Sequence, residues 1–233
     1  MIKTVKIITF IAALLLLLLS IFYINPEEEM ARARTAYKLH DFDQSMRFAR
    51  RAKVFLSAKD KTFAYLLISR SAVKMKRADV ALYYLDEALK TNPKNSAVLL
   101  FKGDTELRAG YLKQAAADIS KGLEFGGDSL ADKHKAYYMA RRGIAYALDQ
   151  DTAAAEQNMI KAFAFYPLLP EAFELKSYVL ENKSEVSGAL KALEKAHKLY
   201  LERNSLYFMS DDGRKLSERF IDLRVKNFQG RKN

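Results

Sequence analysis

Three histidines are the side chains of this sequence best suited to metal chemistry. His40, His134 and His197 lie far apart along the chain, so a shared metal site would require an unusual folded geometry. The chain contains no cysteine, which excludes thiolate zinc sites, cysteine-ligated iron–sulfur clusters, disulfides and a cysteine nucleophile. We therefore expect no metal site.

Paired carboxylates are the second candidate for chemistry, because two acidic groups close together can serve as general acid and base. Asp41 and Asp43 form one pair, and residues 27–29 form an acidic triplet. We interpret both groups as caps and first-turn acids of helices. The sequence also lacks a phosphate-binding glycine loop, a dinucleotide-binding glycine turn, a His-Glu-x-x-His zinc helix and a nucleophile elbow. We expect no catalytic residue, no cofactor and no enzyme activity.

The composition indicates which elements must position any site. Half of the 233 residues are hydrophobic and 29% are charged, which is enough apolar material for one domain or two small ones. Only nine glycines and four prolines are present, fewer than average usage predicts. This scarcity of turn residues favours long helices, so we expect an all-α protein.

An apolar run near the N-terminus differs from the rest of the chain. Residues 7–24 contain no charge, and as a helix they would reach about 27 Å, close to the ~30 Å hydrocarbon core of a bilayer. We predict that residues 1–25 form an uncleaved transmembrane anchor; a cleaved signal peptide and a buried core helix are the alternatives. Lys3 and Lys6 precede the run, which predicts a single-pass membrane protein with a cytoplasmic N-terminus and its remaining residues periplasmic or otherwise extracytoplasmic.

The rest of the chain repeats in steps of 34 to 40 residues. Two small residues seven positions apart recur five times, and a third small residue lies twelve positions before each pair. Small side chains let antiparallel helices approach closely, and Pro93 and Pro167 fall near repeat ends, where a helix must stop. The predicted unit is a helical hairpin. The pairs are Ser45/Ala52, Ala81/Ala88, Ala115/Gly122, Ala155/Ala162 and Ala189/Ala196, and the third residues are Ala33, Ser69, Gly103, Gly143 and Ser177.

This pattern resembles that of the tetratricopeptide repeat (TPR) family, in which aromatic, small, Ala-x3-Phe, Ala and Pro positions recur over 34 residues. The best matches are residues 81–93 (ALYYLDEALKTNP) and 188–196 (GALKALEKA). The family's aromatic position is never Trp here, and the first copy matches least well. The resemblance implies a right-handed α-solenoid of about five hairpins over residues 26–203, at 26–59, 62–95, 96–129, 136–169 and 170–203.

Two irregularities interrupt the repeat. The 40-residue step comes from extra residues in or near 126–133, which we expect to lengthen a loop or to add a helical turn. After residue 203 the pattern stops, and residues 210–212 (SDD) can begin a helix with Leu216, Phe220 and Leu223 at helical spacing. We predict that residues 204–233 form a capping helix, which covers the apolar face of the last repeat, and a basic tail.

The resemblance also implies a ligand groove, because TPR proteins line their concave face with set positions of the first helix of each hairpin. The apolar positions would anchor a peptide, although we expect roughly half of the set to pack against neighbouring helices instead. By register, the groove positions are Arg34, Tyr37, Phe63, Leu66, Arg70, Lys74, Leu100, Asp104, Tyr137, Ile144, Glu174 and Tyr178. Family members that clamp a terminal carboxylate use Lys, Asn, Asn, Lys and Arg, and we exclude that function because the matching residues are Met30, Arg34, Leu67, Ala97 and Phe101.

The net charge of the chain indicates which kinds of partner it could bind. The formal net charge is +11, with the excess in the second copy, around Arg70 and Lys74, and in the tail after Arg214. It fits an anionic membrane surface, an acidic protein or, less well for want of a recognition motif, nucleic acid. The sequence thus predicts a membrane-tethered, non-enzymatic TPR scaffold that binds a protein or extended peptide, in the assembly of an envelope or membrane complex. An anionic-polymer or nucleic-acid binder and an accessory domain of an enzyme complex are the alternatives.

Overall fold

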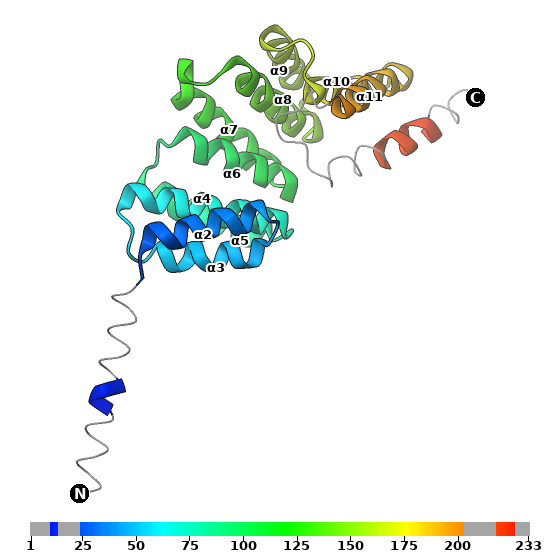
Figure 1. Cartoon of the computed structure of the whole chain (residues 1–233). Coiled ribbons are helices and arrows are strands. Elements are labelled where there is room, and N and C mark those ends of the chain that lie inside the picture. The colour runs from blue at the N-terminus through cyan, green and yellow to red at the C-terminus, as the bar shows by residue number, and fades with distance from the viewer. Residues whose placement is uncertain (1–9, 14–23, 203–217, 227–233) are drawn as a thin grey trace, which may run out of the picture. The chain divides into compact units, whose positions relative to one another are not determined.

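The computed structural model of the 233-residue chain describes residues 10–13, 24–202 and 218–226 (Figure 1). Every regular element in these ranges is helical. The chain divides into two compact units, Met1–Pro93 and Lys94–Asn233, which we describe one at a time. The predicted all-α, helical-repeat fold is confirmed.

The first unit contains two helical hairpins. Helix α2 (Pro26–Lys38) pairs with α3 (Phe42–Ala52), α4 (Ala58–Lys74) pairs with α5 (Ala78–Thr91), and α3 also packs against α4. The helices approach closely because alanine and serine occupy the contact positions, as where the Ser69 hydroxyl donates to the carbonyl of Ala81 at 3.1 Å. The core of this unit consists of Met30, Ala33, Met46, Ala49, Ala52, Ala64, Ile68, Ala72 and Ala81.

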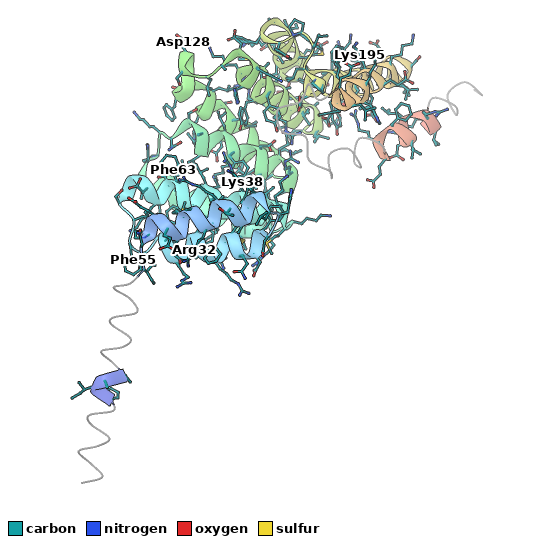
Figure 2. The ribbon with its side chains drawn as sticks, in the orientation of Figure 1. Arg32, Lys38, Phe55, Phe63, Asp128 and Lys195 are labelled. Atoms are coloured by element: carbon teal, nitrogen blue, oxygen red, sulfur yellow. The ribbon has the colours of Figure 1, made fainter. Side chains whose placement is uncertain are left out.

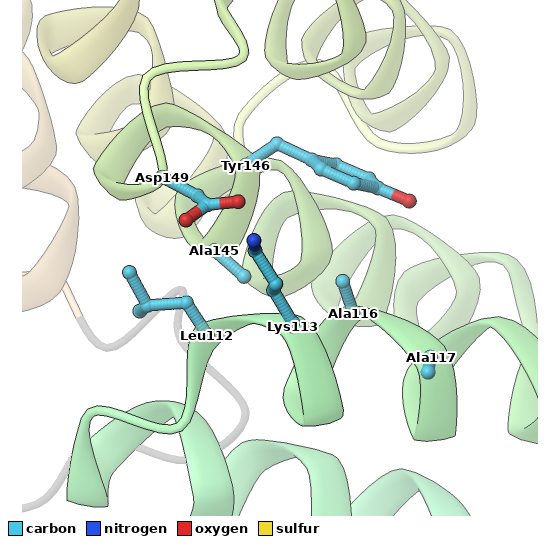
Figure 3. Close-up of a pocket in the computed structure, with 7 residues that line it drawn as sticks. All are labelled: Leu112, Lys113, Ala116, Ala117, Ala145, Tyr146 and Asp149. Carbon is cyan, nitrogen blue, oxygen red and sulfur yellow. The ribbon is translucent and has the colours of Figure 1, made fainter.

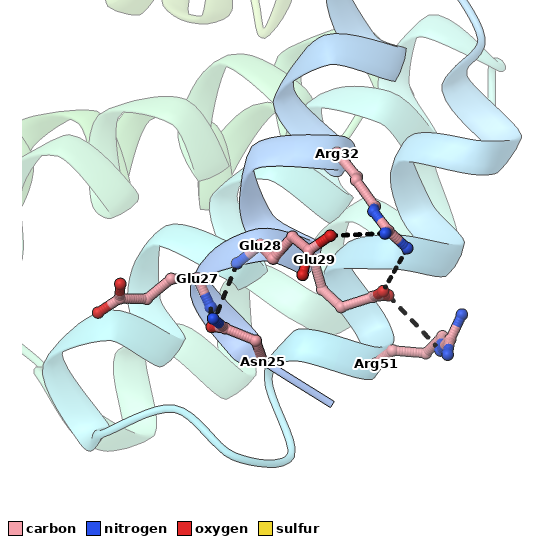
Figure 4. Close-up of polar contacts among 6 residues, drawn as sticks. All are labelled: Asn25, Glu27, Glu28, Glu29, Arg32 and Arg51. Carbon is pink, nitrogen blue, oxygen red and sulfur yellow. Dashed lines mark hydrogen bonds and ion pairs between the residues drawn. The ribbon is translucent and has the colours of Figure 1, made fainter. Parts of the chain in front are cut away.

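The acidic groups singled out above are helix-start residues. The Asn25 side chain accepts hydrogen bonds from the N–H groups of Glu27 and Glu28 at 3.0 and 3.4 Å, which caps α2 (Figure 4). The buried carboxylate of Glu29 lies 3.3 Å from Arg32 and 3.5 Å from Arg51. Asp41 caps α3 by accepting from the N–H of Gln44 at 3.0 Å. The interpretation of Asp41 as a helix cap is confirmed.

The second unit contains three hairpins and repeats the same packing. Helix α6 (Ser96–Ala109) pairs with α7 (Leu112–Gly126), α8 (Asp132–Leu148) with α9 (Thr152–Phe165), and α10 (Pro170–Asn182) with α11 (Val186–Leu201). A Cβ atom on Gly103 would lie 2.5 Å from the Ile119 side chain, so only glycine permits this approach of α6 to α7. Across both units, all fifteen small residues that define the repeat are buried, which confirms the hairpin prediction.

Each hairpin turns through a single residue in the left-handed conformation. The N–H of the residue that follows donates to the carbonyl five positions back, as from Asp41 to Ala36 at 2.9 Å and from Glu185 to Leu180 at 2.8 Å. This bond is typical of the Schellman ending of a helix. The same following residue is the N-cap of the second helix of the hairpin. The turn residues are His40 (φ 62°), Lys76 (59°), Gly110 (88°), Gln150 (66°) and Ser184 (64°).

Four of these five turns hold a side chain where glycine is favoured, which leads to a stability prediction. Gln150→Gly should raise the free energy of unfolding by about 0.5–1 kcal/mol, because the left-handed conformation strains residues that have a Cβ. The matched control, Asp149→Gly, changes a neighbour at φ −83° and should lower it by a similar amount. Urea unfolding followed by circular dichroism measures both, and equal effects from the two glycines would refute the argument.

The long step between the third and fourth copies has a simple structural origin. Gly127–Ser129 forms a 3-10 turn, η1, directly after α7, and the following helix α8 has 17 residues against 14 in α6. Lys135 of α8 forms a 3.6 Å ion pair with Asp128 of this turn. The expected insertion near residues 126–133 is therefore confirmed as an added helical turn.

The predicted membrane span is corrected by the structure. Residues 7–9 and 14–23 of the apolar run lie outside the described residues, and residues 10–13 are helical. Within the ranges described, no helix combines the length and the apolar character needed to cross a bilayer. The localisation as a single-pass membrane protein with extracytoplasmic repeats is therefore wrong on this finding. The prediction had rested on the apolar composition and length of the run and on Lys3 and Lys6 before it.

A further helix at residues 218–226 follows the last hairpin. Its Leu223 is 1% exposed and packs in a cluster with Leu193 and Tyr200 of α11. Residues 210–212 and Leu216 of the predicted capping segment lie outside the described residues. The assignment of residues 204–233 as a cap thus stays a prediction.

Candidate ligand-binding surface

The predicted groove residues of the first unit share an accessible surface on α2 and α4. On α4 they are spaced three or four residues apart, which places them on one face of the helix. Phe63 is 54% exposed, and Figure 2 shows it on α4. Arg34, Arg70 and Lys74 are exposed, whereas Tyr37 and Leu66 are half-buried. We call these six residues the α2–α4 surface.

Positive charge dominates the α2–α4 surface. Three of its six side chains are cationic and none is acidic. Burial raises the pKa of the Tyr37 phenol, and the positive charge of Arg70 opposes that rise, so the two helices bring these side chains near each other. Two carboxylates of α2 are engaged by other arginines: Glu28 pairs with Arg32 at 2.6 Å, and Glu29 lies between Arg32 and Arg51. The surface thus combines an exposed aromatic ring with cations.

The predicted groove residues of the second unit are, in contrast, engaged in the core. Leu100, Tyr137 and Ile144 are at most 3% exposed and belong to its hydrophobic cluster. Glu174 and Tyr178 are half-buried, and the Tyr200 hydroxyl donates to the Glu174 carboxylate at 3.1 Å. These side chains offer little surface to a ligand. The expectation that part of the set packs against neighbouring helices describes this unit well.

Asp104 is the centre of a buried polar network in the second unit. Its carboxylate accepts from Arg141 Nε at 2.6 Å, from Arg108 Nε at 2.9 Å and from the Tyr137 hydroxyl at 3.3 Å. Burial raises the pKa of Asp104, but the two guanidinium groups outweigh burial and lower it to about 2. Burial likewise disfavours the charge on Arg141, and the Asp104 carboxylate restores it, with a pKa above the ordinary value. The network links α6 with α8 through paired charges.

Because of this network, the free energy of unfolding depends on pH. A pKa near 2 in place of 3.8 corresponds to about 2.5 kcal/mol of unfolding free energy at neutral pH. Because the folded-state pKa is the lower one, this contribution is complete above about pH 5 and is lost as the pH falls towards 2. Urea midpoints measured from pH 7 to pH 3 should therefore decline less for Asp104→Asn than for the unaltered chain. Parallel declines would show that Asp104 is not the group responsible.

The arginines of this network were missed by the sequence analysis. Arg108 follows Asp104 by four residues on α6, a spacing that does predict an ion pair. Arg141 lies 37 residues after Asp104, close to one repeat, and this separation is the only signal that could have indicated the contact. Repeat spacing brings residues onto neighbouring helices, but it does not specify which side chains meet.

A small pocket on α7 and α8 was also unpredicted. It has a volume of about 290 Å³, near the lower limit of typical ligand sites. Alanines form its floor, and Lys113, Tyr146 and Asp149 stand around it (Figure 3). The lining residues are Leu112, Lys113, Ala116, Ala117, Ala145, Tyr146 and Asp149.

The histidines occupy unrelated positions. His40 is the turn residue between α2 and α3, with its ring edge-on to Phe42 at 5.7 Å, whereas His134 lies in α8 and His197 in α11. Among the described residues, no group of three histidine or carboxylate side chains is placed to hold a metal ion.

The helical hairpins and their small-residue contacts are those of the TPR fold. No protein-family model and no curated protein sequence matches the chain. Solved structures match it at low sequence identity. They therefore support the fold alone.

Three of these structures illustrate the likeness. The MamA protein is 13% identical, with a TM-score of 0.60, over 77% of this chain and 93% of MamA. TTC0263, a TPR protein of Thermus thermophilus, is 17% identical, with a TM-score of 0.57, over 86% of this chain and all of its own. YrrB, described as a TPR protein with an unusual peptide-binding site, is 16% identical, with a TM-score of 0.57, over 73% of this chain and 84% of its own.

Proposed function

We propose that this protein is a non-enzymatic scaffold that binds an acidic protein segment or extended peptide on its α2–α4 surface. The observation that carries the proposal is the exposure of Phe63 in a setting of cationic side chains. Aromatic rings that become buried on binding supply much of the affinity of protein interfaces. Nearby cations select acidic partners and speed their association.

The second unit supports this choice of surface. Its groove charges are already satisfied, since Asp104 holds two arginines and Glu174 accepts from Tyr200. A ligand there would have to displace buried ion pairs, which is costly. The TPR fold of the structural neighbours, one of them described as having a peptide-binding site, favours the same function. A role in assembling a larger complex belongs to this proposal, because a scaffold acts by holding its partners together.

An anionic polymer such as a nucleic acid is the second candidate, favoured by the exposed cations at Arg34, Arg70 and Lys74. The two ligands differ in salt dependence. Binding to phosphates weakens steeply with salt, because each contact releases counterions. A peptide anchored by Phe63 should show a shallower dependence, since apolar burial does not release ions.

The proposal is tested with a phage-displayed library of random peptides and the immobilised full chain. Enriched peptides should combine Asp or Glu with an aromatic or aliphatic residue. Phe63→Ala should weaken them at least tenfold, whereas the control Tyr83→Ala should not, although Tyr83 is an equally exposed ring on α5 (59%). Absence of enrichment, or equal losses from both variants, would refute the α2–α4 surface.

A further inference from the structure

The helix at 218–226 packs against the last hairpin of the second unit. We call its binding surface there, formed by Ser177, Tyr178, Glu181 and Leu193, the seat. Figure 1 draws it in red, close to α10 and α11. Leu223 is fully buried against Leu193, Ala196 and Tyr200, and Phe220 packs at the edge of the same cluster. The apolar half of the contact is thus a small hydrophobic cluster shared by this helix and α11.

The polar half of the contact is centred on Arg219. Its guanidinium carbon lies 3.2 Å from the centre of the Tyr178 ring, a stacked cation–π arrangement. One guanidinium nitrogen donates to the Ser177 hydroxyl at 2.6 Å and another to the Glu181 carboxylate at 3.1 Å. Lys226 donates to the other oxygen of Glu181 at 2.7 Å. Arg219 is 14% exposed in this position, so the seat desolvates it almost entirely.

The seat is selective for cations. Burial raises the pKa of Glu181, but the hydrogen bonds from Lys226 and Arg219 outweigh it and lower the pKa below the ordinary value. Glu181 is therefore an ionised acceptor. The occupant carries the pattern Arg-Phe-x-x-Leu-x-x-Lys, with Arg219, Leu223 and Lys226 spaced to face one side of a helix.

The occupant has features of an exchangeable ligand. Of its described residues, Arg219, Phe220, Leu223 and Lys226 make the contacts given above, so few side chains hold it in place. Among residues 218–226, only Leu223 is fully buried. Sixteen residues of sequence separate it from the end of α11 at Leu201, which makes it a tethered segment rather than a continuation of the hairpin.

We propose that the seat formed by Ser177, Tyr178, Glu181 and Leu193 is a second binding site, specific for a basic amphipathic helix of a partner protein. Residues 218–226 fill it in cis, and a partner helix with the same spacing of Arg, Leu and Lys binds by displacing them. The site lies on α10 and α11, so it is independent of the α2–α4 surface and of the function proposed for that surface.

The test uses a fluorescein-labelled peptide of residues 216–228 and the full-length chain. Leu223→Asp in the chain should release the resident helix, and the peptide should then bind at least tenfold more tightly than to the unaltered chain, where the seat is filled. Adding Glu181→Lys should abolish this gain, whereas Glu194→Lys, on the exposed side of α11, should preserve it. Fluorescence anisotropy measures each affinity.

A charge-reversal pair separates recognition from misfolding. A peptide with Lys226→Glu should bind the Leu223→Asp chain poorly and should bind the chain that also carries Glu181→Lys more tightly than that chain binds the original peptide, a preference that an unfolded chain does not produce. The preference should be modest, because Arg219 of either peptide still faces position 181. Equal affinity of the original peptide for the unaltered and Leu223→Asp chains, or absence of this preference, would overturn the proposal. Formation of a dimer by the Leu223→Asp chain in place of peptide binding would overturn it as well.

Discussion

Arg141→Met should lower the free energy of unfolding of the second unit by about 3 kcal/mol. The substitution removes the 2.6 Å partner of Asp104 and leaves a buried carboxylate with Arg108 as its remaining guanidinium donor. Removing one partner of a buried ion pair is costly, because the other charge then lacks both water and its counterion. Urea unfolding at pH 7, followed by circular dichroism, measures the change.

The neighbour Arg142 supplies a matched control. It is also partly buried, but its partners are neutral: Asn158 at 2.8 Å and Ser120 at 3.0 Å. Arg142→Met should therefore cost only about 1 kcal/mol. The double variant Asp104→Asn/Arg141→Met should lose less than Arg141→Met alone, because no uncompensated carboxylate remains. A loss for Arg141→Met no larger than for Arg142→Met would contradict the importance of the charge pair.

Reversing the charges of Arg70 and Lys74 should have the largest effect on binding. Arg70→Glu/Lys74→Glu should weaken an acidic peptide from the library selection by about 100-fold, equivalent to ~2.7 kcal/mol. At two positions one helical turn apart, the attraction between a cationic side chain and the acidic peptide is replaced by repulsion between two negative charges. Because both side chains are exposed, the melting temperature should change little. Titration calorimetry at low and high salt measures the effect.

The chain offers a control with the same geometry elsewhere. Lys191 and Lys195 are exposed and also lie four residues apart, on α11. Lys191→Glu/Lys195→Glu changes the net charge by the same amount and should leave peptide binding within about twofold, because long-range charge alone acts weakly at physiological salt. If both double variants weaken the peptide equally, the effect comes from overall charge and the α2–α4 surface is not the site.

The hairpin architecture could be predicted because it depends on the size of side chains that are close in the sequence. Gly103 and Ala115 show why: the two helices of a hairpin can approach closely only where side chains are small, and that requirement repeats along the chain. The cap at Asp41 was equally local, since it depends on residues three positions apart.

The candidate sites were harder to predict because they depend on which surfaces meet. Register placed Phe63 and Tyr137 at matching positions, yet the first is exposed and the second is buried beside Asp104. The pairing of Arg141 with Asp104, and of Arg219 with Tyr178, joins residues about one repeat apart whose contact is set by helix packing. The membrane span failed for a related reason, since apolar length alone did not establish a spanning helix.

The fixed geometry of the hairpin turns bears on how this chain tolerates insertions. In every repeat, the first small contact residue lies five positions after the left-handed turn residue, as Ser45 does after His40 and Ala155 after Gln150. The variation in repeat length therefore lies outside the turn of each hairpin, as in the 3-10 turn at 127–129 and the longer start of α8. An insertion within a hairpin would rotate one helix against its partner. Gene duplication or loop grafting at the joints between hairpins would preserve every internal contact, which makes those joints the natural points for extending or redesigning this protein.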